Sequence, residues 1–268
     1  MDYIKYIILG IIQGLTEPLP VSSSGHIFLF KNLFNTEVFN TLNFEIISNF
    51  GSFLAILFIF RKDIIKLIKN FFNFIFNNKK RNDNKDGFMY VIKMVISTIP
   101  VGITGLLFND YLETNYTSLK FLAISFLFTS LMLFIVKNIK GEKGSYDITI
   151  KDSIIIGLFQ AITIIPGISR SGTVLVACLI CKLKREDALK YTFMLYFPVS
   201  VGTMLLKASD LINTPTSLLF PYLCGMLAAL IVTYFTYQWL SNLVKKGSLW
   251  KFSIYCLCLA IFILIYFR

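Results

Sequence analysis

Long apolar stretches separated by short polar segments dominate this chain. Six stretches, at about 44–60, 88–108, 118–136, 191–206, 218–240 and 252–267, approach the ~20 residues that a helix needs to cross a bilayer. Two more, 3–30 and 152–181, are interrupted near the middle by Pro, Gly and Ser. Non-helical backbone persists at membrane depth only where protein or a wet cavity surrounds it. The pattern therefore predicts an all-α integral-membrane protein with six transmembrane helices plus two re-entrant helical hairpins.

The two interrupted stretches are copies of one motif. Residues 7–25, IILGIIQGLTEPLPVSSSG, align without a gap to residues 154–172, IIIGLFQAITIIPGISRSG. Three predicted spans separate the copies, so they enter from opposite sides and their tips can meet near the midplane. We interpret the chain as a single integral-membrane domain, 1–268, with an inverted-topology repeat of about 1–136 and 152–268. Many secondary transporters share this plan, so the architecture favours transport as readily as catalysis.

The basic residues support this topology. The chain is 56% hydrophobic, only 15% charged, and carries a net charge of +11. Segments 61–87, 137–151, 182–190 and 241–251 carry 8, 4, 4 and 3 Lys or Arg residues, whereas the intervening polar segments carry only Lys31 and Lys207. By the positive-inside rule the first group is cytoplasmic. This alternation indicates contact with membrane lipids and argues against a nucleic-acid partner.

Two cytoplasmic features follow the first predicted span. The stretch 63–76 places Lys66 and Lys69 among Ile, Leu and Phe, which is typical of an interfacial amphipathic helix. The following stretch, 77–87, reads NNKKRNDNKDG and is interpreted as a polar linker.

The two copies differ mainly in charge. The first holds Glu17 and His26, whereas the second holds Arg170 and no acid. A charged group at the bilayer centre costs roughly 2.5–3.5 kcal/mol on insertion scales. A structural Glu17–Arg170 ion pair is one interpretation. Buried ion pairs stabilise poorly compared with apolar packing, so a functional site is the favoured one.

The second tip has the composition of a phosphate site. Its sequence PGISRSG supplies glycine for tight backbone, two hydroxyl groups and one guanidinium. Backbone N–H groups and hydroxyls can hold phosphate oxygens while an arginine binds two of them. The predicted substrate-binding residues of this tip are Ser169, Ser171, Gly172 and Thr173, with Arg170 as a catalytic residue.

The first tip adds an acid, hydroxyls and an imidazole. Gln13 and Glu17 share one helical face and could hold a divalent cation, Mg²⁺ or Ca²⁺. Ser23 and His26 suit nucleophile–base chemistry, although a lone histidine is often only a satisfied core residue. Glu17, Ser23 and His26 are therefore predicted to be catalytic. The predicted substrate-binding residues here are Gln13, Ser22, Ser24 and Gly25.

Another acid, Glu45, lies near the end of the 44–60 stretch. It either lines the same cavity or sits at the interface, where charge is tolerated.

These motifs resemble those of the undecaprenyl-diphosphatase family, the bacterial bacitracin-resistance proteins. Gln13 and Glu17 match its (E/Q)xxxE motif, PVSSSGH at 20–26 follows it, and PGISRSG at 166–172 matches its PGxSRSGxT motif. Two positions depart from the pattern. The family threonine falls at Val174, whereas this chain has Thr173, and Asn49 stands where Gln is expected.

The resemblance implies hydrolysis of undecaprenyl diphosphate to the monophosphate and phosphate. It also implies dependence on a divalent cation, bacitracin resistance, and a site open to the extracytoplasmic side of the plasma membrane. Glu17, Ser23, His26 and Arg170 carry over as its functional residues. A transporter or flippase for an anionic substrate is the alternative, and a homodimer is one alternative for the oligomeric state.

Overall fold

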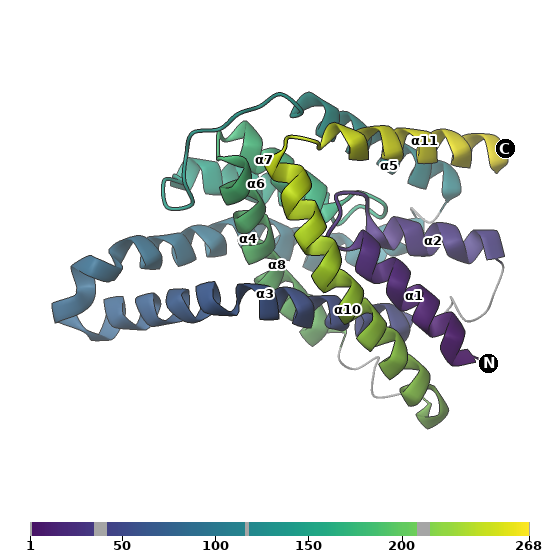
Figure 1. The fold of residues 1–268 in the computed structure, drawn as a ribbon, viewed down its shortest axis with the longest axis horizontal. Coiled ribbons are helices and arrows are strands. Elements are labelled where there is room, and N and C mark those ends of the chain that lie inside the picture. Colours follow the sequence, from purple (N-terminus) through teal and green to yellow (C-terminus); the bar gives the residue numbers. More distant parts are fainter. Residues whose placement is uncertain (1, 35–41, 116–117, 208–214, 268) are drawn as a thin grey trace.

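The computed structural model describes residues 2–34, 42–115, 118–207 and 215–267. The helices in chain order are α1 (Asp2–Thr16), α2 (Ser23–Phe34), α3 (Leu42–Phe76), the short 3₁₀ helix η2 (Asn78–Lys80), α4 (Arg81–Asn115), α5 (Leu119–Ile135), α6 (Ile150–Ile162), α7 (Arg170–Ile180), α8 (Arg185–Leu206), α10 (Thr216–Lys245) and α11 (Trp250–Tyr266). The described residues form no β-strand beyond an isolated bridge between Lys143 and Leu183. The predicted all-helical class is confirmed (Figure 1).

Several helices are suited to a membrane. Within the described ranges, α3, α4, α8 and α10 are long and apolar enough to cross one, whereas α5 and α11 are apolar but have 17 residues each. Large apolar side chains such as Phe58, Leu106, Leu131 and Phe235 are exposed on these helices. An apolar surface this extensive is suited to lipid and not to water. The chain is therefore a multi-pass membrane protein.

The segment after the first predicted span differs from the prediction. Residues 44–60 and 63–76 belong to one continuous helix, α3, and 77–87 is a linker only at 77–80, because α4 already begins at Arg81. Figure 1 shows α3 and α4 projecting together as an antiparallel arm. At its end the rings of Phe74 and Phe88 stack with centroids 4.1 Å apart. Hydropathy locates the apolar part of a helix, and the helix itself continues through polar sequence.

Both interrupted stretches form helical hairpins. The breaks fall at 17–22 between α1 and α2 and at 163–169 between α6 and α7, where the sequence predicts them. Each hairpin packs on the other half of the chain, with α1 against α10 and α6 against α4. A Cβ built on Gly10 would lie 2.1 Å from the carbonyl oxygen of Gly225, so small residues allow α1 and α10 to approach closely.

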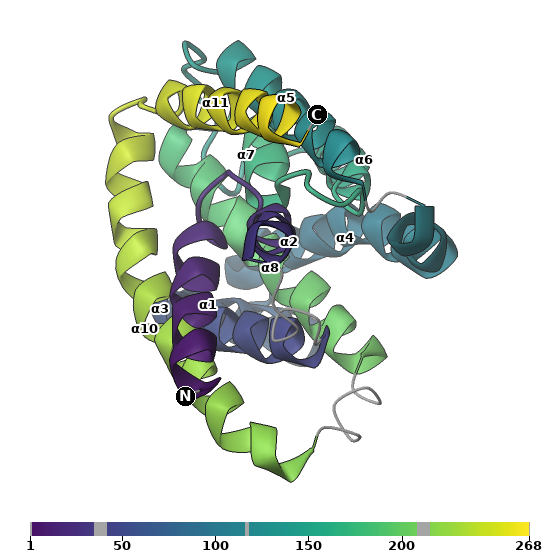
Figure 2. The same cartoon turned by 90° about the vertical axis from the view of Figure 1, so that its right-hand side faces the viewer.

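The last helices of the two halves also pair. Helices α5 and α11 lie side by side along one edge of the molecule in both views (Figures 1 and 2). The Ser130 hydroxyl donates to the carbonyl oxygen of Ser253 at 2.8 Å, and the Ser253 hydroxyl donates to the carbonyl oxygen of Ser130 at 2.8 Å. This reciprocal pair satisfies both buried hydroxyls at the centre of the helix contact.

The four basic segments come together in space. Lys190 pairs with Asp63 at 2.5 Å, and Lys245 pairs with Glu186 at 3.4 Å. The loop 137–151 reaches the segment 182–190 through the Lys143–Leu183 bridge. Segments far apart in sequence thus share one end of the molecule, as the charge pattern predicts.

Candidate functional site

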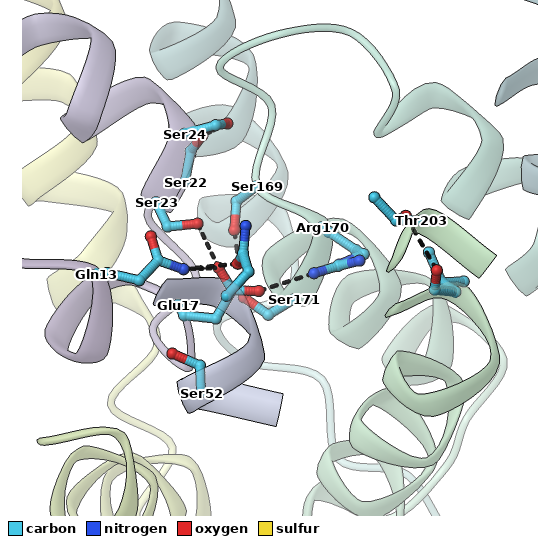
Figure 3. A network of polar contacts seen from close by, with 12 residues as sticks. Gln13, Glu17, Ser22, Ser23, Ser24, Ser52, Ser169, Arg170, Ser171 and Thr203 are labelled. Carbon is cyan, nitrogen blue, oxygen red and sulfur yellow. Dashed lines mark hydrogen bonds and ion pairs between the residues drawn. The ribbon is translucent and has the colours of Figure 1, made fainter. Parts of the chain in front are cut away.

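A cavity of about 470 Å³ lies between the two hairpin tips and helices α3, α4 and α8. Residues from both tips line it, among them Glu17, Ser22, Ser23, Ser24, Ser169, Arg170 and Ser171. The tips therefore meet, as the sequence predicts, and their polar side chains point toward one another (Figure 3).

The two tips are built in the same way. In the first, the Ser22 hydroxyl accepts a hydrogen bond from the Gly25 backbone N–H at 3.2 Å. In the second, the Ser169 hydroxyl accepts one from the Gly172 N–H at 3.1 Å. Each serine thus satisfies an N–H group in the first turn of the following helix, α2 or α7. Gly25 and Gly172 serve these turns and do not line the cavity.

Glu17 is the centre of the polar network. Its Oε2 atom accepts hydrogen bonds from Gln13 Nε2 at 2.9 Å and from Ser23 Oγ at 2.5 Å, and its Oε1 atom accepts one from Arg170 Nη2 at 2.7 Å. The carboxylate has a side-chain exposure of only 7%. It thereby links a hydroxyl of one half of the chain to the guanidinium of the other.

Arg170 is held from two directions. Besides its ion pair with Glu17, its guanidinium lies over the ring of Tyr196, 4.7 Å from the ring centroid. An arginine fixed in this way but still 29% exposed at the side chain keeps donors free to face an anion in the cavity.

His26 does not reach the cavity. The residue is 3% exposed, and its Nδ1 lies 2.7 Å from the carbonyl oxygen of Ser22. Because a carbonyl only accepts, Nδ1 carries the proton, and Nε2 accepts from the Tyr255 hydroxyl at 2.7 Å. The prediction of a base facing Ser23 is not met in this arrangement: the ring holds the backbone of Ser22, whose φ of 68° is left-handed.

Thr173 does not line the cavity either. It is 1% exposed, and its hydroxyl has no hydrogen-bond partner among the described residues, whereas the neighbouring Val174 lines the cavity. Successive helix residues point about 100° apart. The one-residue shift from the family pattern therefore removes the hydroxyl from the site, which corrects the prediction of Thr173 as a substrate-binding residue.

Gln13 is a buried member of the hydrogen-bond network around Glu17. It is fully buried, and its Nε2 donates to Asn49 Oδ1 at 2.7 Å as well as to Glu17. Within the part of the chain that the structure describes, its buried Oε1 has no hydrogen-bond partner. Because the nitrogen faces the carboxylate, Gln13 orients Glu17 in this arrangement and does not share a cation with it.

The donors around the cavity fit a hard divalent cation. Glu17, Glu45 and Asn49 all line it and carry side-chain oxygen atoms, the ligands that Mg²⁺ and Ca²⁺ take. Among the described residues there is no group of three or more His, Cys, Asp and Glu side chains that could enclose a metal ion. Such an ion would take its remaining ligands from water or from substrate oxygens, as Mg²⁺ commonly does.

Several lining residues have no counterpart in the sequence motifs. They include Thr98, Tyr196 and Thr203. On α8, positions 196, 200, 203 and 207 follow a helical period, but the period alone does not say which part of the molecule that face meets.

The helices and the cavity define a membrane protein with a polar site between two broken hairpins. A family model for the bacitracin resistance protein BacA matches residues 6–262, and the chain belongs to that family.

Curated relatives agree. The chain is similar to undecaprenyl-diphosphatase 1 of Bacillus cereus, with 43% identity over 98% of this chain and 97% of the relative. It is 40% identical to undecaprenyl-diphosphatase of Oceanobacillus iheyensis over 98% and 96% of the two chains. With undecaprenyl-diphosphatase 1 of Bacillus licheniformis it shares 39% identity over 99% and 100%. The resemblance in the motifs is therefore confirmed over nearly the full length.

Proposed function

We propose that the protein hydrolyses undecaprenyl diphosphate to undecaprenyl phosphate and inorganic phosphate. The observation that carries this proposal is the linked set Ser23–Glu17–Arg170, assembled from both halves at the wall of one cavity. A hydroxyl hydrogen-bonded to a carboxylate, beside a fixed guanidinium, suits phosphoryl transfer. The names of the full-length relatives supply the substrate.

In the proposed reaction the oxygen of Ser23 or of a water molecule attacks the terminal phosphorus. The new P–O bond forms as the bridging P–O bond breaks, and undecaprenyl phosphate leaves with the electron pair. Glu17 accepts the proton of the attacking hydroxyl, and Arg170 stabilises the charge on the phosphoryl oxygens. If Ser23 attacks, a water molecule then hydrolyses the phosphoserine.

A divalent cation, Mg²⁺ or Ca²⁺, would be held by Glu17 with Glu45 and Asn49 as further oxygen ligands. Bound there, it would neutralise diphosphate charge.

We place the cavity on the extracytoplasmic side of the bacterial plasma membrane. The basic segments form the cytoplasmic face, six helices cross, and the α1–α2 and α6–α7 hairpins re-enter from opposite sides. Helices α5 and α11 would each span about 25 Å at ~1.5 Å per residue, close to the ~30 Å hydrocarbon core. The isoprenoid tail would lie among the exposed apolar helices.

The two halves, about 1–136 and 152–268, would form one domain with internal two-fold symmetry. The exchange of contacts supports this, since α1 of the first half packs on α10 and α6 of the second half packs on α4. The same symmetry favours the alternative function, a transporter or flippase. The homodimer stays a prediction.

Hydrolysis of this lipid would recycle the carrier for cell-wall synthesis and deprive bacitracin of its target.

The test reconstitutes the protein in liposomes that contain an isoprenyl diphosphate. Phosphate release and movement of a labelled lipid between leaflets are measured in the same vesicles, with Mg²⁺, with Ca²⁺ and with EDTA. Metal-dependent release supports hydrolysis. Lipid movement without phosphate release would contradict hydrolysis and indicate transport.

A further inference from the structure

A stripe of polar side chains on α8 leads away from the cavity. Tyr196, Ser200, Thr203 and Lys207 follow one another at intervals of four, three and four residues, so they share one face of the helix. Tyr196 lies under the Arg170 guanidinium, and Lys207 is the residue that ends α8. The stripe thus connects the arginine of the site to a second cation at the helix end.

The far part of this stripe lines a second cavity of about 120 Å³, which we call the outer cavity. Its polar lining consists of Glu45, Asn49, Arg170, Ser200, Thr203 and Lys207. Arg170, Asn49 and Thr203 line the main cavity as well, so the two spaces share a wall. Ser23 and Glu17 line the main cavity and not the outer one.

This division separates Ser23 and Glu17 from the outer cavity. An anion in the outer cavity can contact Arg170 and Lys207, and it is then no longer beside the Ser23 hydroxyl. The Ser200 hydroxyl adds a further polar group to the lining, whereas the Thr203 hydroxyl donates to the carbonyl oxygen of Val199 at 3.0 Å. The Glu45 carboxylate, on α3, also lines the outer cavity, repels an anion and keeps its binding weak. Weak binding by two cations and one hydroxyl is suited to a product that is leaving the site.

We propose that the outer cavity binds the inorganic phosphate that the reaction releases and directs it out along α8. This inference rests on the proposed function and adds a product site to it. The same cavity could instead bind a phosphate group that is still attached to the lipid substrate, and the experiment distinguishes these two ligands.

The experiment measures product inhibition by inorganic phosphate during hydrolysis of an isoprenyl diphosphate. In Lys207→Gln, loss of a donor to a charged ligand is expected to raise the inhibition constant of phosphate about fivefold or more. The KM for the lipid should change less than about twofold, since its phosphates react in the main cavity. Lys120→Gln, at the start of α5 and outside both cavities, is the matched control.

Binding of inorganic phosphate to the purified protein by calorimetry gives a readout that does not need turnover. It should weaken in Lys207→Gln and not in Lys120→Gln. Unchanged inhibition and unchanged binding in Lys207→Gln would overturn the product site. A rise in KM without a rise in the inhibition constant would assign the cavity to the lipid and also overturn it. An inactive wild type that still binds phosphate through Lys207 would count against the proposed hydrolysis alone.

Discussion

The two hairpin tips share a scaffold and differ in their chemistry. Ser22 and Ser169 occupy equivalent positions and hold the following helices by the same hydrogen bond. The next residue is Ser23 in one tip and Arg170 in the other, and both reach Glu17. Symmetric backbone thus delivers two different groups to one carboxylate, which is how a duplicated anion-binding turn can become an asymmetric active site.

The tips also differ in how they are held. The first tip has a left-handed residue at Ser22, fixed by His26, whereas the second places its positive φ at Gly167, where it causes no strain. The equivalent of His26 in the second tip is Thr173, whose buried hydroxyl meets no hydrogen-bond partner in the described ranges. The first tip therefore needs the His26 imidazole to hold its left-handed backbone at Ser22, and the second tip needs no such group.

The largest expected effect comes from Glu17, whose carboxylate links Ser23 of the first tip to Arg170 of the second. Glu17→Gln keeps the side-chain shape but removes the charge that pairs with Arg170 and the acceptor for the Ser23 proton. We expect phosphate release to fall by about 10²-fold or more. Glu142→Gln, on an exposed loop, is the control and should release phosphate at the wild-type rate. A Glu17→Gln protein with wild-type turnover would show that the tips do not act together.

The two hairpins differ in how closely they pack on the other half of the chain. A Cβ at Gly10 would lie 2.1 Å from a carbonyl oxygen of α10, whereas one at Gly157 would lie 2.9 Å from a carbonyl oxygen of α4. We expect Gly10→Ala to separate the helices and to lower stability by roughly 1–3 kcal/mol, with a smaller loss for Gly157→Ala. Thermal unfolding in detergent measures both. Equal losses of stability in the two variants would mean that α1 packs on α10 as closely as α6 packs on α4.

Removal of the hydroxyl that holds His26 tests the strained tip. Tyr255→Phe deletes the donor to Nε2 and should destabilise the protein by about 1 kcal/mol. Turnover should fall only a few-fold, and the pH profile should keep its shape because His26 is not the base. A lost limb of the pH profile in His26→Gln, in protein that still folds, would restore the catalytic role for the imidazole.

The smallest expected effect concerns the shifted threonine. Thr173→Val should change phosphate release less than about twofold, since the hydroxyl faces no partner and no cavity. The converse variant, Val174→Thr, puts a hydroxyl into the cavity and should lower the KM. If Thr173→Val were as inactive as Glu17→Gln, the orientation of the first turn of α7 would be wrong.

Much of the site could be predicted because its residues lie within two short motifs that the duplication aligns. The break positions followed from Pro, Gly and Ser within apolar sequence, and the meeting of the tips followed from the number of spans between them. The orientation of His26 and Thr173 could not be predicted, since one residue turns a side chain by about 100° on a helix. The contribution of Tyr196 depends on how α8 docks, which only long-range packing decides.

The most direct measurement is phosphate release from an isoprenyl diphosphate by the wild type, Arg170→Ala and the exposed control Arg61→Ala. All three proteins should elute alike, and Arg170→Ala should unfold at a somewhat lower temperature because it loses both the ion pair with Glu17 and the contact with the Tyr196 ring. The account predicts metal-dependent release by the wild type and Arg61→Ala and none above background by Arg170→Ala. Wild-type release by Arg170→Ala would contradict the site formed between the two tips.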